Sequence, residues 1–145
     1  MDIEIIEKKL RLELYGASGV ALNQDWEQTG FALMNEMWKQ IKAADVKHKG
    51  LNVWVYERGN KMFAGVELES KPGSDLLLEF KTITLLRYAY YKHIGPYSQI
   101  REAGSKVTEE LTRRGLQTGL PYIEIYGHWT DDEARLETEL IWCLS

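Results

Sequence analysis

One acidic residue and several aromatic residues alternate with aliphatic residues in two short segments of the sequence. The first segment is Val53-Trp54-Val55-Tyr56 and the second is Ile123-Glu124-Ile125-Tyr126. Because successive side chains of a β-strand point to opposite faces, the aromatic residues of the first segment are expected to share a face with Glu124 and Tyr126. A carboxylate among aromatic rings can hold a cation, since ring faces attract positive charge and a partly dry site strengthens the attraction to the carboxylate.

The same residues fit a second interpretation, in which they bind no ligand. Glu124 could instead be a solvent-facing strand residue paired with a lysine on a neighbouring strand, while Trp54 and Tyr56 belong to a closed core.

Secondary structure predicted from the residue pattern would position these side chains in two similar halves. Strands are predicted over 3–15, 51–57, 62–69, 82–93, 121–126 and 136–144, and helices over about 24–44 and from Tyr97 or Ser98 to Arg114. Gly16 to Gly19 are predicted to form a break after the first strand, and 71–75 form the clearest linker. Each half therefore reads β-α-β-β.

The two predicted helices repeat one spacing of residues. The matching positions are Trp26, Gly30, Leu33 and Met37 in the first half and Ile100, Gly104, Val107 and Leu111 in the second. A glycine on an apolar helix face needs a packing reason, and close approach of helix to sheet would supply one.

The predicted fold is therefore α+β, a tandem β-α-β-β duplication in a single domain of residues 1–145. Its pseudo-repeats are about 1–70 and 76–145. Both helices are expected on one face of an antiparallel sheet, over Val53, Val55 and the matching isoleucines. Glu124 and its aromatic neighbours would then line a ligand cleft on the opposite face.

Other aromatic residues divide between the cleft and the core. Tyr88, Tyr90 and Tyr91 occupy both faces of one predicted strand, so only some of them can face a cleft, and Tyr91 is the one predicted to bind ligand. Three tryptophans at periodic apolar positions are expected in the core: Trp26, Trp38 and Trp142.

Composition narrows the class of protein. The 145 residues carry a formal net charge of −4, and an acidic surface repels phosphate backbones, so direct nucleic-acid binding is not expected. No apolar run approaches the roughly 18 residues of a membrane span, and Met1-Asp2-Ile3-Glu4 is unlike a signal peptide. The single cysteine, Cys143, is expected to pack in the last strand. These features favour a cytoplasmic protein without a membrane partner.

No cofactor or metal site is predicted. The three histidines, His48, His93 and His128, lack the spacing of metal ligands. The segment Gly16-Ala17-Ser18-Gly19 lacks the pattern of a phosphate-binding or dinucleotide-binding loop.

Two segments of the second half carry a family resemblance. Tyr91-Lys92-His93-Ile94-Gly95-Pro96-Tyr97, followed by a predicted helix and then Pro121-Tyr122-Ile123-Glu124-Ile125-Tyr126, resembles the GyrI-like, AraC-type effector-binding domain family. This family includes the ligand-binding halves of bacterial multidrug-responsive transcription regulators. The resemblance covers essentially the whole chain. It implies a tandem β-α-β-β fold with a pocket for lipophilic, often cationic, small molecules.

The resemblance also implies roles for particular residues. Glu124 would be the acid of the pocket, and Tyr126, Trp54 and Tyr56 would form its walls. Some relatives are enzymes that open cyclopropane rings of toxic natural products. This likeness would make Glu124 a general base toward water, with Tyr126 supplying a proton. Others are thought to modulate a partner protein, DNA gyrase. The chain has no room for the helix-turn-helix domain of the regulators, so it resembles a free-standing version, like those encoded in mobile integron cassettes.

Overall fold

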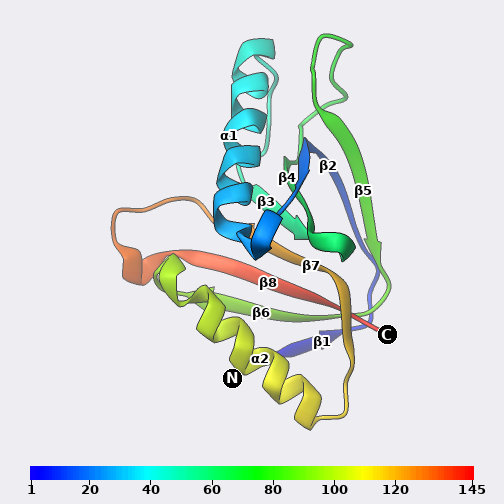
Figure 1. Cartoon of the computed structure of the whole chain (residues 1–145), viewed down its shortest axis with the longest axis vertical. Coiled ribbons are helices and arrows are strands. Elements are labelled where there is room, and N and C mark those ends of the chain that lie inside the picture. The colour runs from blue at the N-terminus through cyan, green and yellow to red at the C-terminus, as the bar shows by residue number, and fades with distance from the viewer.

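Two copies of a β-α-β-β unit share one antiparallel sheet in the computed structural model, which describes residues 1–145 (Figure 1). The strands are β1 (Glu4–Ile6), β2 (Leu10–Val20), β3 (Asn52–Tyr56), β4 (Lys61–Val66), β5 (Glu79–Leu85), β6 (Tyr88–Ile94), β7 (Thr118–Tyr126) and β8 (Glu137–Leu144). The helices are α1 (Trp26–Ala44) and α2 (Ile100–Arg113). The α+β class and the antiparallel sheet with two helices are confirmed.

The two halves meet where β3 pairs with β7. The order of the eight-stranded sheet is β1-β6-β8-β7-β3-β4-β2-β5. Trp54 lies opposite Glu124 at the junction, with Val53 opposite Ile125 and Val55 opposite Ile123. The local twofold relation of the two copies therefore passes through the Trp54–Glu124 pair.

The outer strands are exchanged between the halves. β1 pairs with β6 of the second half, and β5 pairs with β2 of the first half. The predicted strand 3–15 is therefore broken between Ile6 and Leu10, and the predicted strand 82–93 is broken between Leu85 and Tyr88. Each break carries the chain from the edge of one half to the edge of the other.

The glycine-containing segment 16–19 continues β2 and does not break it. A Cβ atom at Gly16 would overlap the Ala64 carbonyl oxygen of the neighbouring strand β4. Glycine here allows β2 to pass close to β4 while it also pairs with β5.

One face of the sheet is buried without any helix. Its buried cluster consists of Leu12, Leu14, Val53, Val55, Phe63, Ile83, Leu85, Ile123 and Ile141. These residues come from strands of both halves, and Figure 1 shows β2 and β5 running across the direction of β6 and β8. The sheet is coiled around this cluster, so its two halves bury each other's aliphatic side chains.

The two helices cover separate parts of the other face. Met37 and Ile41 of α1 pack with Val66 of β4, while Val107 and Leu111 of α2 pack in a second cluster. The second cluster draws its sheet residues from β6 and β8: Ala89, Leu140, Trp142 and Leu144. Neither helix has the length and apolar composition of a membrane-spanning segment. The middle of this face, over β3 and β7, lies between the helices.

The prediction that the cleft lies on the face opposite the helices is wrong, because it lies on the helix side. The alternation of residues along the strands is as predicted. Val53 and Val55 lie in the helix-free cluster. Trp54 packs with Trp26, Leu33 and Met34 around α1, on the helix side. Both faces of β3 are buried. The coiled sheet covers the aliphatic face of β3, so the helices pack over its aromatic face.

Candidate functional site

A cleft of about 1230 Å³ opens on the helix side of the sheet. α1 contributes Trp26 and Phe31, and α2 contributes Arg101 and Gly104. The sheet supplies Trp54 and Tyr56 of β3, Tyr122, Glu124 and Tyr126 of β7, and Trp142 of β8. The turn 57–60 and the loop 127–129 also contribute lining residues. The cleft therefore occupies the space between the two helices, where the two copies join.

Glu124 lies in the sheet that forms one side of the cleft and is only 6% exposed. Its Oε1 accepts hydrogen bonds from the hydroxyls of Tyr56 (2.8 Å) and Tyr126 (2.6 Å), and its Oε2 accepts one from Tyr122 (2.9 Å). Strand geometry produces this arrangement, because Tyr122 and Tyr126 flank Glu124 at alternate positions of β7, and Tyr56 lies opposite Tyr122 on β3. Three tyrosine hydroxyls thus surround one carboxylate.

The three tyrosines remain protonated donors. Burial, followed by the negative charge of Glu124, raises the pKa of Tyr56, Tyr122 and Tyr126 far above the usual tyrosine value. Each phenol therefore keeps its proton and donates to the carboxylate, which can only accept. A buried negative charge is stabilised here without a lysine or arginine hydrogen-bonded to it.

Aromatic rings form two groups of contacting rings beside Glu124. The Trp54 ring meets Tyr126 edge-on at 5.4 Å between centroids, and Phe31 at 5.3 Å. On the other side, Tyr56 contacts Trp26 at 5.6 Å and Tyr122 at 5.3 Å. Edge-to-face contacts stabilise such rings beyond their buried area, so the two groups give the cleft an aromatic lining.

Four of the five residues predicted to bind ligand lie together in the cleft: Trp54, Tyr56, Glu124 and Tyr126. Tyr91 does not line it, and its ring packs against the cluster under α2. The strand order explains the difference, because β8 separates β6 from β7. The alternative pairing of Glu124 with a lysine is wrong, since its cross-strand neighbours are Trp54 and Leu140.

The tryptophans that the sequence placed in the core have different positions in the structure. Trp26 was expected in the core, but it lines the cleft, while Trp142 is buried and also lines it. Trp38 lies outside the cleft and donates from Nε1 to Asn52 Oδ1 at 2.6 Å. Tyr122 is a lining residue that the sequence reasoning missed, although its position two residues before Glu124 places it on the same face of the strand.

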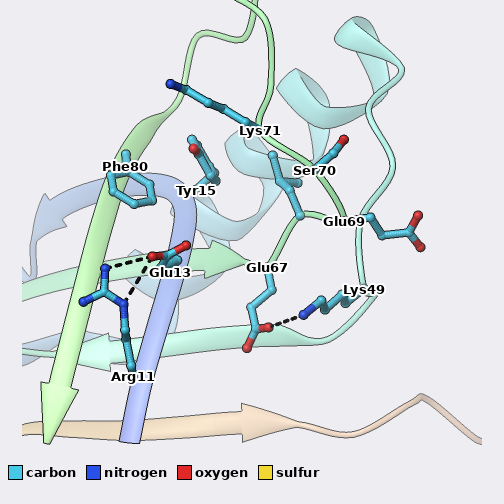
Figure 2. A pocket seen from close by; sticks show the side chains of 10 residues that line it. Arg11, Glu13, Tyr15, Lys49, Glu67, Glu69, Ser70, Lys71 and Phe80 are labelled. Carbon is cyan, nitrogen blue, oxygen red and sulfur yellow. Dashed lines mark hydrogen bonds and ion pairs between the residues drawn. The ribbon is translucent and has the colours of Figure 1, made fainter.

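A second concave surface, of about 920 Å³, lies beside β2 and β5 (Figure 2). Four of its charged side chains form ion pairs, as Arg11 Nη2 lies 2.8 Å from Glu13 Oε1 and Lys49 Nζ lies 3.0 Å from Glu67 Oε2. These pairs are largely exposed, and no buried charge faces this surface. We therefore assign the candidate site to the cleft around Glu124. No three His, Cys, Asp or Glu side chains lie together in an arrangement that could hold a metal ion.

The coiled sheet, its two helices and the cleft between them define a small-molecule-binding domain. The GyrI-like small molecule binding domain matches residues 31–144. The chain therefore belongs to the GyrI-like family.

Solved structures share the fold. The EcmrR C-terminal domain has a TM-score of 0.70 at 16% identity, over 100% of this chain and 99% of that domain. SAV2435 bound to tetraphenylphosphonium has a TM-score of 0.65 at 17% identity, over 100% and 94% of the two chains. An integron cassette protein from the mobile metagenome of Vibrio cholerae has a TM-score of 0.56 at 11% identity, over 99% and 95%. No match is found among curated protein sequences.

Proposed function

We propose that the cleft binds lipophilic small molecules that carry a positive charge. The observation that carries this proposal is Glu124, a carboxylate held by three neutral phenols inside an aromatic cleft and without an ion-pair partner. A buried charge is costly to keep unless an opposite charge approaches it. A ligand cation would supply that charge.

The aromatic lining suits the rest of such a ligand. Flat apolar groups can bury their surface against Trp54, Tyr56 and Tyr126, and each cation–π contact adds roughly 0.5–2 kcal/mol. The similar protein SAV2435 is described as bound to tetraphenylphosphonium, a cation surrounded by phenyl rings. That observation belongs to the other protein, and it supports the class of ligand proposed for this one.

The arrangement gives less support to hydrolysis with Glu124 as general base. A general base must contact the proton that it removes. Both oxygens of Glu124 already accept hydrogen bonds from tyrosines that retain their protons. A hydrolase from Listeria innocua is similar in structure, with a TM-score of 0.51 at 12% identity. A likeness at this identity supports a shared fold alone and does not favour hydrolysis here.

The proposal is tested with the Glu124→Gln variant and tetraphenylphosphonium. The amide keeps the size of the side chain but removes its charge, so we expect affinity to fall by about tenfold or more, or roughly 1.4 kcal/mol. Titration calorimetry measures the affinity. Quenching of tryptophan fluorescence gives a second readout, because Trp26 and Trp54 line the cleft.

Glu139→Gln is the matched control. Glu139 Oε2 also accepts a hydrogen bond from a tyrosine, Tyr90, at 2.7 Å, but neither residue lines the cleft. This control should bind tetraphenylphosphonium like the unmodified protein. Equal affinities for the unmodified protein and Glu124→Gln would show that the charge of Glu124 does not contribute to binding.

A further inference from the structure

Two arginine side chains line the cleft without a carboxylate partner. Arg58 lies in the turn Arg58–Asn60 between β3 and β4, and Arg101 lies in the first turn of α2. Neither takes part in an ion pair or a side-chain hydrogen bond in the structure, whereas Glu57, another charged residue of the lining, is bound to Lys81 at 2.9 Å. Both arginine residues are exposed to solvent.

Arg101 lies within electrostatic reach of Tyr56, one of the tyrosines around Glu124. Burial and Glu124 raise the pKa of Tyr56, and the positive charge of Arg101 acts in the opposite direction. The hydroxyl of Tyr56 is also a direct donor to Glu124. One region of the cleft therefore holds a buried negative charge with an unpaired positive charge nearby.

A ligand that is only cationic uses part of this charge. The acidic Glu124 and the exposed Glu27 of the lining would attract such a ligand, while Arg58 and Arg101 would repel it and keep no partner. A ligand that also carries an anionic group would pair with the guanidinium groups, since a guanidinium presents paired donors that match a carboxylate or sulfonate.

We propose that the preferred ligands of this cleft are amphoteric aromatic molecules. The cationic part lies against Glu124, and a carboxylate or sulfonate is bound by Arg101, with Arg58 as a second donor at the turn. This inference rests on the proposed function and narrows the class of ligand.

A pair of rhodamine dyes that differ only by one methyl group tests the inference. The free acid carries a carboxylate beside its cationic ring system, and the methyl ester keeps the cation without the carboxylate. We expect the unmodified protein to bind the free acid more tightly. Arg101→Ala should weaken binding of the free acid by about tenfold, as expected for loss of a hydrogen bond to a charged group, and should leave the ester unchanged or bound more tightly.

Arg113→Ala is the matched control, because Arg113 lies at the far end of the same helix and pairs with Glu110 outside the cleft. It should change the affinity for neither dye. Equal binding of acid and ester by the unmodified protein, or equal losses of both in Arg101→Ala, would overturn the inference and leave the proposed function in place. Binding of neither dye would overturn both.

Discussion

Above about pH 10, the folded protein is expected to lose stability by roughly 4 kcal/mol per pH unit through three tyrosines of the cleft. Burial, with the charge of Glu124 second, raises the pKa of Tyr56, Tyr122 and Tyr126. Unfolded tyrosines lose their protons near pH 10, whereas these three retain them in the folded protein. The unfolded state then binds fewer protons, so each tyrosine lowers the free energy of unfolding by about 1.4 kcal/mol per pH unit.

The direction of the effect follows from the direction of the shifts. The raised pKa values contribute stability that is fully present below pH 10 and is lost as the pH rises above it. Native proteins have about 5–15 kcal/mol of stability, so unfolding is expected within a few pH units. The pKa values of Tyr90 and Tyr97 are also raised by burial, but these side chains are more exposed and water screens their contribution.

Denaturant unfolding measured at a series of pH values gives the slope, and circular dichroism follows the folded fraction. Tyr122→Phe removes one of the three ionisable groups, so its slope should be smaller by about 1.4 kcal/mol per pH unit than that of the unmodified protein. The difference between the two proteins cancels the contributions of lysines and other tyrosines. Identical slopes for the two proteins would contradict the hydrogen-bonded group around Glu124.

The members of this group could largely be predicted because strand alternation is a local property. Glu124 and Tyr126 share a face through spacing alone, and the repeated segment adds Trp54 and Tyr56 to the same face. The same rule reaches Tyr122. The residue types then indicate cation binding, because aromatic ring faces and a carboxylate both attract positive charge.

The face of the sheet that carries the cleft could not be predicted in the same way. Val53 and Val55 read as the side facing a helix, since their alternation with Trp54 and Tyr56 suggests one buried face. In the structure both faces of β3 are buried, because the sheet is coiled and its second half covers the aliphatic side. The coil depends on contacts between residues far apart in the sequence, which alternation does not encode.

The exchange of edge strands between the two halves could not be predicted for a similar reason. No glycine or proline lies between Ile6 and Leu10 or between Leu85 and Tyr88, so the sequence gives no turn signal at either break. The breaks are required by the order of the sheet. β1 lies beside the strands of the second repeat, whereas β2 lies among the strands of the first repeat. Tyr91 was misplaced by the same missing information, since its distance from Glu124 depends on β8 lying between β6 and β7.

The two helix glycines repeat in the sequence but differ in their surroundings. A Cβ atom at Gly30 would overlap the Trp54 ring, whereas a Cβ atom at Gly104 would lie 3.8 Å from Cζ2 of Trp142, an ordinary contact. Trp54 has little room to move, because its ring is held between Phe31 and Tyr126. Only Gly30 therefore has a packing requirement for glycine.

Gly30→Ala is expected to destabilise the protein by about 1–3 kcal/mol through overpacking, despite the higher helix propensity of alanine. Gly104→Ala, the matched control, should be neutral or more stable by up to about 1 kcal/mol, because it gains propensity without a clash. Denaturant unfolding at neutral pH measures both. Titration with tetraphenylphosphonium should show weaker binding by Gly30→Ala, since relief of the overlap must displace Trp54 from the lining of the cleft. Equal stability of the two variants would show that α1 can move away from β3, and that Trp54 does not fix the width of the cleft.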